Sequence, residues 1–207
     1  NSFKLIIRNL HQLFIKNDHI NKENASILIE TFRKISEILL FGDQNDQIIM
    51  DYFLENLMIK YFLNYLNYEK DNAFGVSKQI LQTLNILFEN ISSETSIYYL
   101  LSNNLTDTII THKFNLSDEE IIAYYISFLK TLSFRTNVNT LPFFFNSTER
   151  QFPLLFESLK LFNHPENMVQ IAVRTIFLNI CRSESYMLSK LISTFQSRYL
   201  LATFFIR

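Results

Sequence analysis

The sequence predicts an all-α protein, and more specifically an armadillo- or HEAT-like right-handed α-solenoid of about four irregular helical repeats. Three observations predict this fold. The 207 residues include only 2 Gly and 3 Pro, too few for the many turns of a β-sandwich or barrel. Hydrophobic residues make up 48% of the chain and charged residues 19%, so the chain can form a core. One apolar pattern also recurs along the chain at intervals of 41 to 53 residues.

Four segments place apolar residues at positions i, i+4, i+7 and i+11, which form one face of a helix with 3.6 residues per turn. Each segment is followed by a polar turn and by one or two further apolar helices. An irregular helical bundle would show the same segments and stays the alternative to a solenoid. The segments are ILIETFRKISEIL (27–39), ILQTLNILFENI (80–91), IIAYYISFLKTL (121–132) and VQIAVRTIFLNI (169–180).

The first predicted repeat ends in the stretch LLFGDQND, where a run of four acid and amide residues follows a glycine. Gly42 stands where a helix C-terminus favours a residue in the left-handed conformation. The polar side chains after it suit the start of the next helix, or a surface that a partner contacts. The four polar residues are Asp43, Gln44, Asn45 and Asp46.

Polar residues also mark the starts of later helices. Ser92 or Ser93 is expected to cap the helix that follows the second segment. Ser117, with Glu120 three residues later, predicts a capping box before the third segment. Pro165 is expected at the first position of the helix that contains the fourth segment, where its missing N–H costs nothing.

The residues that enzymes and metal sites require are largely missing. Cys181 is the single cysteine, so no intrachain disulfide can form, and its apolar surroundings indicate a small buried hydrophobe in a reducing compartment. None of the 4 His has a second ligand at zinc-site spacing, and the sequence has no GxSxG, P-loop or GxGxxG motif. We therefore predict no enzymatic activity, no metal and no cofactor.

The charge balance and hydropathy argue against two classes of partner. The net charge is −1 and the isoelectric point about 6.5, so we predict no nucleic-acid binding and no polybasic contact with lipid. No apolar run approaches the roughly 20 residues that cross a bilayer. Association with membranes is therefore expected to be indirect or peripheral.

Two features could form a protein-binding surface. Asn90 and Asn179 occupy equivalent positions in two repeats, where armadillo folds place asparagines that bind an extended peptide. Glu37 and Thr131 interrupt the series, and ordinary helix amides are the alternative. The aromatic runs at 143–145 and 152–156 are expected mostly in the core, although an apolar patch for a partner is possible there.

Several stretches together resemble the FPL-domain family, over roughly residues 5–180 and in the same order. Phe152-Pro153-Leu154 matches the motif after which the family is named. The other matching stretches are FGDQND (41–46), LQTLNILFENIS (81–92), SETSIYYLLSNN (93–104), HKFNLSDEEIIAYYISFLKTLS (112–133) and FNHPENMVQIAVRT (162–175).

The resemblance implies a cytoplasmic, non-enzymatic helical adaptor that acts at the surface of endosomes and lysosomes. It implies roles in membrane trafficking and in autophagy or mitophagy, with tethering, sorting or autophagy proteins as partners. A component of a ubiquitin-ligase complex, or a helical-repeat subunit of an unrelated large assembly, is the alternative. We expect residues 1–207 to be a single FPL-type domain, and the apolar end LLATFFIR indicates a segment of a longer protein.

Overall fold

The computed structural model describes residues 2–70, 72–102, 105–145 and 151–183. This part of the chain is all-helical, as predicted, and contains no β-strand. Its elements are α1 (Ser2–Lys16), α2 (Ala25–Asn45), α3 (Gln47–Glu55), α4 (Ile59–Tyr68), α5 (Val76–Asn90), α6 (Glu94–Ser102), α7 (Leu105–Ile110), α8 (Glu119–Phe134), the 3-10 helix η1 (Leu141–Phe144), α9 (Pro153–Lys160) and α10 (Asn167–Ser183).

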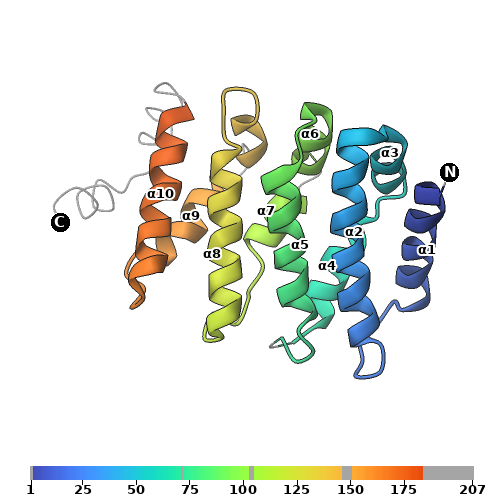
Figure 1. Cartoon of the computed structure of the whole chain (residues 1–207). Helices are drawn as coiled ribbons and strands as arrows, with labels where there is room; N and C mark the ends of the chain where they lie inside the picture. Colours follow the sequence, from blue (N-terminus) through green and yellow to red (C-terminus); the bar gives the residue numbers. More distant parts are fainter. Residues whose placement is uncertain (1, 71, 103–104, 146–150, 184–207) are drawn as a thin grey trace.

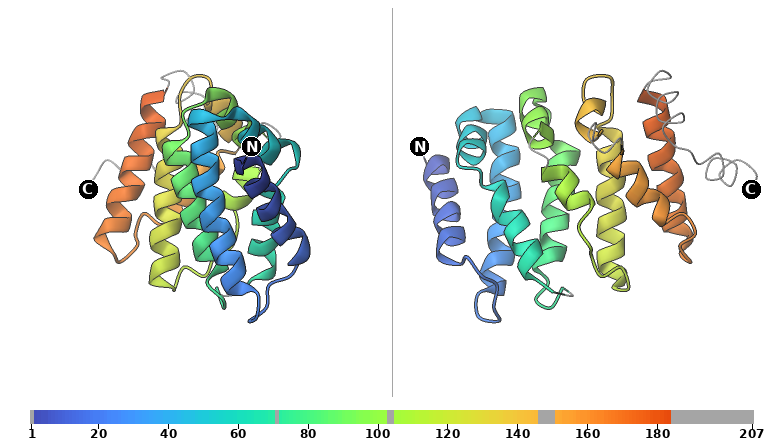
Figure 2. Two further views of the ribbon diagram at one scale, coloured as in Figure 1. Left: turned by 45° about the vertical axis from the view of Figure 1, so that its right-hand side comes forward. Right: turned by 180° about the vertical axis from the view of Figure 1, so that it is seen from behind.

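The four long helices that carry the repeated pattern lie side by side in chain order (Figure 1). The three most extensive helix–helix contacts are those of α2 with α5, of α5 with α8 and of α8 with α10. The shorter helices α3, α4, α6, α7 and α9 form a second layer behind this row (Figure 2). Helix α1 lies beside α2, at the end of the row where the chain begins. No helix within the described residues is both long and apolar enough to cross a membrane.

The repeated apolar stripe forms the core between the two layers. Every stripe side chain is buried, and the most exposed of them, Tyr125, has an exposed fraction of 3%. Burial of one such side chain contributes roughly 1.5–3 kcal/mol, so the stripe is a major source of stability. The buried positions are Leu28, Phe32, Ile35 and Leu39 of α2; Ile80, Leu84, Leu87 and Ile91 of α5 and its C-cap; Ile121, Tyr125, Phe128 and Leu132 of α8; and Val169, Val173, Ile176 and Ile180 of α10.

Gly42 does not end a helix, so that prediction was wrong. It is buried within α2, which continues to Asn45, and its carbonyl oxygen accepts a hydrogen bond from the N–H of Asp46. The reason for glycine is contact with the next helix. A Cβ atom on Gly42 would lie 2.8 Å from Cβ of Ile49 in α3, closer than side chains normally pack.

Two predicted helix starts are also corrected. Asp118, and not Ser117, is the N-cap of α8, because its carboxylate accepts hydrogen bonds from the N–H groups of Glu120 and Ile121. Pro165 precedes α10 by two residues and does not occupy its first position. The apolar end of the chain at 200–207 lies outside the described residues.

Replacing Gly42 by Ala tests the close approach of α2 and α3. Alanine is favoured over glycine within a helix by about 1 kcal/mol, so an unhindered site would be stabilised. We expect the opposite sign, with a loss of about 1–3 kcal/mol in the free energy of unfolding from overpacking against Ile49. Urea unfolding followed by circular dichroism measures the change. Gln44→Ala, at an exposed site on the same helix, is the control, and a more stable Gly42→Ala protein would contradict the assignment.

Candidate functional site

Asp43, in the polar stretch after Gly42, connects the end of α2 to the turn between α5 and α6. Its carboxylate accepts hydrogen bonds from the backbone N–H of Ser92 at 2.8 Å, from the hydroxyl of Ser92 at 2.9 Å and from the N–H of Ser93 at 3.3 Å. Ser93 in turn caps α6, since its hydroxyl oxygen accepts from the N–H of Ser96 at 3.4 Å. Asp43 at the end of α2 therefore holds the turn between α5 and α6.

The other polar residues of this stretch have local roles. Asp46 is the N-cap of α3 and accepts a hydrogen bond from the N–H of Ile48 at 3.2 Å. The Asn45 amide donates to the carbonyl oxygen of Phe41 in its own helix at 3.0 Å. Gln44 is exposed and has no hydrogen-bond partner among the described residues. Of the four polar side chains, Gln44 is thus the one most open to a partner.

Arg135 connects α8 to the end of α5 at the same edge. Its Nη2 donates to the carbonyl oxygens of Glu89 and Ile91, each at 2.9 Å, and its Nε donates to that of Phe88. These are C-terminal carbonyls of α5, which the helix itself cannot pair. Burial lowers the pKa of the Arg135 guanidinium, and the negative charges of Asp43 and Glu89 oppose that shift. Together, Asp43 and Arg135 join α2, α5 and α8 along one edge.

Asn90 and Asn179 do not form a matched pair. The amide of Asn90 is exposed and donates to the carbonyl oxygen of Ile86 in its own helix at 2.8 Å. The amide of Asn179 donates to the hydroxyl of Ser133 at 3.0 Å and so joins α10 to α8. The two side chains differ in exposure and in hydrogen-bond partner, and a shared peptide groove stays a prediction.

Asn85 is a polar residue that the sequence analysis missed. Its amide donates to the carbonyl oxygen of Tyr124 at 3.1 Å, and its carbonyl oxygen accepts from the hydroxyl of Thr131 at 3.2 Å. The amide of Gln82 donates to the Tyr124 hydroxyl. These contacts form a polar seam between α5 and α8. Gln82 and Asn85 are three residues apart, so they lie on the same face of α5. This spacing could have indicated a polar contact with a neighbouring helix.

The Phe152-Pro153-Leu154 motif lies in the core. The exposed fractions of Phe152 and Leu154 are 1% and 0%, and Pro153 is also buried. Pro153 begins α9, and the ring of Phe152 lies 6.4 Å from that of Phe144 in η1, measured between ring centroids. The motif therefore starts a helix and fills the core, and its side chains offer no accessible surface to a partner.

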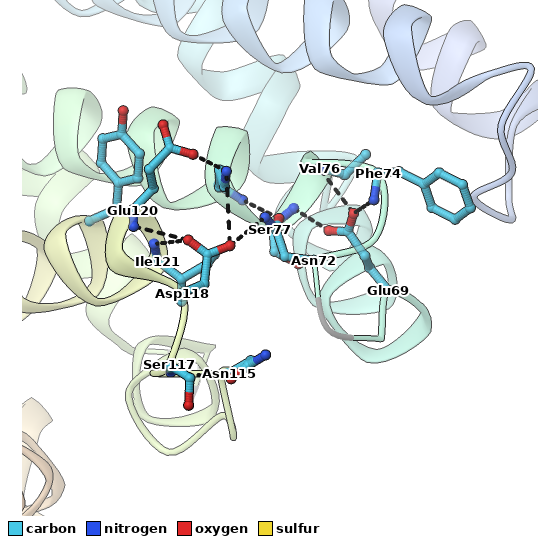
Figure 3. A network of polar contacts seen from close by, with 12 residues as sticks. Glu69, Asn72, Phe74, Val76, Ser77, Asn115, Ser117, Asp118, Glu120 and Ile121 are labelled. Atoms are coloured by element: carbon cyan, nitrogen blue, oxygen red, sulfur yellow. Dashed lines mark hydrogen bonds and ion pairs between the residues drawn. The ribbon is translucent and has the colours of Figure 1, made fainter.

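A second polar network joins the N-terminal ends of α5 and α8 (Figure 3). The carboxylate of Glu69, which is 7% exposed, accepts from the backbone N–H groups of Phe74 at 2.8 Å, Val76 at 3.1 Å and Ser77. A buried carboxylate is costly unless it is hydrogen-bonded, and here the N-terminal N–H groups of α5 satisfy it.

Asp118 extends this network to α8. Its carboxylate accepts from the N–H groups of Glu120 at 2.9 Å and Ile121 at 3.2 Å, and lies 3.9 Å from Nζ of Lys78. The hydrogen bond from Ile121 is the largest cause of a lowered pKa for Asp118, with Glu120, Lys78 and Asn72 also contributing. Lys78 on α5 also pairs with the carboxylate of Glu120, so the two long helices are linked near both ends.

A cavity of about 430 Å³ opens between α5 and α8 at the other end of the seam. Phe134, at the last turn of α8, has an exposed fraction of 63% although it is aromatic. Lys130 lies one turn earlier and has no ion pair among the described residues. The lining is mostly polar and carries charges of both signs; it consists of Phe88, Glu89, Ser127, Lys130, Thr131, Phe134 and Arg135.

Other reactive groups do not gather into a site in the described ranges. Cys181 is half-buried against the core, as expected of a small hydrophobe, and burial raises the pKa of its thiol. A raised pKa leaves little of the nucleophilic thiolate at neutral pH. Within residues 2–183, apart from the gaps, no three His, Cys, Asp or Glu side chains lie together as a metal site would require.

Comparison with known proteins identifies the family. The family model described as "FPL: Uncharacterised conserved protein" matches residues 32–181. The chain belongs to the FPL family. The resemblance found in the sequence is thereby confirmed. No solved structure matches this chain.

Relatives of this FPL chain occur in animals and in a plant. Protein CLEC16A of Mus musculus is 55% identical over 174 residues, which are 84% of this chain and 17% of that protein. The CLEC16A homolog of Drosophila melanogaster is 49% identical over 86% of this chain and 17% of its own length. Protein TRANSPARENT TESTA 9 of Arabidopsis thaliana is 38% identical over 78% of this chain and 19% of its own length. The chain thus spans less than a fifth of these relatives.

Replacing Asp43 by Ala tests the link between repeats. We expect the free energy of unfolding to fall by roughly 1–3 kcal/mol, because two backbone N–H groups and a hydroxyl lose a charged acceptor. Urea unfolding gives the value. Glu37→Ala removes an exposed carboxylate from the same helix and should change stability by no more than about 0.5 kcal/mol. Equal stability of the two variants would show that the Asp43 contacts contribute nothing.

The Asp118 cap predicts a pH dependence. The folded-state pKa of Asp118 lies below its ordinary value of 3.8, so the ionised form stabilises the fold. This contribution is present above about pH 5 and is lost as the pH falls below 3.8 and through the folded pKa. Asp118→Asn keeps a capping side chain but cannot ionise. The difference in urea midpoint between the two proteins should therefore shrink on acidification, and a difference that does not vary with pH would contradict the lowered pKa.

Proposed function

We propose that this FPL chain is a non-enzymatic scaffold that binds proteins of endosome–lysosome trafficking and of autophagy or mitophagy. It acts in the cytoplasm, and it reaches endosomal or lysosomal membranes through its partners. Membership of the FPL family and 55% identity to CLEC16A over 84% of the chain carry the proposal. The role in trafficking and autophagy is inferred from the resemblance of the sequence to the FPL-domain family. The family match and the relatives give names and not activities.

The proposal includes the armadillo-like architecture. Four long helices follow one another in a row, and shorter helices of a second layer connect each to the next, as in right-handed α-solenoids. Such stacks leave one face of successive helices open to solvent, and that face is where they bind extended partners. A large exposed surface of rigid helices suits a scaffold better than it suits catalysis.

A component of a ubiquitin-ligase complex is the second candidate. A RING-type ligase needs a set of zinc ligands, and a ligase that carries ubiquitin on its own chain needs a reactive cysteine. The one cysteine, Cys181, has a raised thiol pKa and is half-buried. We therefore expect this chain, assayed alone with activating and conjugating enzymes, to transfer no ubiquitin. Transfer that Cys181→Ser abolishes would establish the ligase.

Proximity labelling in the native cell tests the scaffold. The labelling enzyme is fused to the protein that contains this chain, expressed at its natural level, with a cytosolic protein of similar size as control. We expect tethering, sorting or autophagy proteins among those labelled above the control. Gln44→Ala probes an exposed residue of the 42–46 stretch without removing a cap. Labelling confined to subunits of an unrelated large assembly would contradict the proposal in favour of a generic helical-repeat subunit.

A further inference from the structure

Ser117 is the part of the expected capping box that the structure leaves without a role. Asp118 caps α8 in its place, and the carboxylate of Glu120 pairs with Lys78. The backbone N–H of Ser117 donates to the side-chain oxygen of Asn115 at 3.2 Å, whereas its hydroxyl has no hydrogen-bond partner among the described residues. Helix capping therefore does not account for the serine in this Ser-x-x-Glu pattern.

The residues after Ser117 carry a charge pattern that acid-directed protein kinases select. Asp118, Glu119 and Glu120 place a carboxylate at each of the three positions that follow the serine. In the whole sequence, Ser117 is the only Ser or Thr with Asp or Glu three residues later. Kinases discriminate between substrates by charge, and a kinase with a basic substrate groove recognises such carboxylates through ion pairs. The pattern thus distinguishes one hydroxyl from all others in the chain.

The hydroxyl of Ser117 is accessible to an enzyme. Ser117 is exposed and lies in the connection between α7 and α8, at residues 111–118. Figure 3 shows its side chain pointing away from Asp118 and Glu120, on the outer side of the polar network. The serine therefore takes no part in the contacts that join α5 to α8, and a group added to its oxygen extends into solvent.

Unwinding the first turn of α8 leaves the core in place. A kinase holds its substrate in an extended conformation, so residues 118–120 have to leave the helix. Glu119 and Glu120 are exposed, and the first buried side chain of α8 is Ile121, with an exposed fraction of 1%. The side-chain contacts that are lost are the two hydrogen bonds of the Asp118 carboxylate and the ion pair of Glu120. Helix ends open at low cost, so the site can be reached in the folded chain.

We propose that Ser117 is a phosphorylation site for an acid-directed Ser/Thr protein kinase. Oγ of Ser117 attacks the γ-phosphorus of ATP, the bond from that phosphorus to the β–γ bridging oxygen breaks, and ADP leaves. The hydroxyl proton passes to the catalytic aspartate of the kinase. Asp118, Glu119 and Glu120 pair with basic side chains of the kinase groove. The inference goes beyond the proposed scaffold function and does not depend on it.

Phosphorylation at this position changes the charge of the surface and leaves the fold in place. A phosphoserine carries a charge of about −1.5 to −2 at pH 7. Negative charge near the N-terminus of a helix is favourable, so the phosphate does not oppose α8. It adds to the charges of Asp118 and Glu119. The connection between α7 and α8 thus becomes strongly acidic, which alters its attraction for charged partners.

Phosphorylation of the full, folded chain by purified casein kinase 2 and ATP tests the site. We expect a single phosphorylated position, and no phosphate on Ser117→Ala, as measured by intact-mass spectrometry. Fragmentation of the tryptic peptide 114–130 distinguishes Ser117 from Ser127. Glu120→Gln should lower the initial rate roughly tenfold or more, because the carboxylate three residues after the serine loses its charge.

Matched variants separate recognition from general damage. Glu94→Gln makes the same charge change at an exposed carboxylate in the first turn of α6. Ser102→Ala removes another exposed serine, which has no carboxylate three residues later. Both should be phosphorylated at the rate of the unaltered chain, and circular dichroism checks that all four variants are folded. The phosphorylated chain should keep the urea midpoint of the unmodified chain, because the core is untouched.

Three results would overturn the inference. They are the absence of phosphate on the folded chain, phosphate on other Ser or Thr residues instead, and equal rates for Glu120→Gln and the unaltered chain. Mass spectrometry of the protein purified from the native cell with phosphatase inhibitors completes the test. Phosphorylated Ser117 there supports the site, and its absence where the unmodified peptide 114–130 is well detected overturns it. Proximity labelling judges the scaffold function separately.

Discussion

The contact of Asp43 with the turn at Ser92 and Ser93 sets the pattern for how the repeats are joined. A helix end has N–H or C=O groups that its own hydrogen bonds cannot reach. Here a side chain from a neighbouring repeat pairs them, as Asp43 does for the turn before α6 and Arg135 for the last carbonyls of α5. Side chains from α2 and from the end of α8 therefore both complete the backbone hydrogen bonding around the end of α5.

This arrangement fixes which residues remain for a partner. Several polar side chains of the row form contacts between helices, including Asn85, Asn179 and Lys78. Groups without such a role, above all Lys130 and Phe134, are held on helices that those same contacts make rigid. A binding surface on rigid elements loses little entropy when a partner docks. The seam between α5 and α8 thus supports the cavity that it borders.

Gly42 and the Phe152-Pro153-Leu154 motif show that distinctive residues need not mark a binding surface. Gly42 permits α2 and α3 to approach, and the motif begins α9 inside the core. Both features serve the close packing of the two layers of helices. In an interior packed this densely, adding or removing one methylene group changes the stability of the fold. Both features lie in stretches that resemble the FPL family, which agrees with a fold shared across the family. Because they are buried, contacts with partners have to come from other residues.

The sequence by itself determined the helices and the sides they bury. The apolar spacing that begins at Leu28 and Ile80 placed every stripe residue in the core, because a 3.6-residue period leaves one face for burial. The sequence did not determine which polar residues form hydrogen bonds with one another. Asp118 rather than Ser117 caps α8, and Asn179 bonds to Ser133, through contacts between segments far apart in the chain. Local patterns contain no information on such distances, so only the tertiary structure decided the caps, the seam and the exposed face around Phe134.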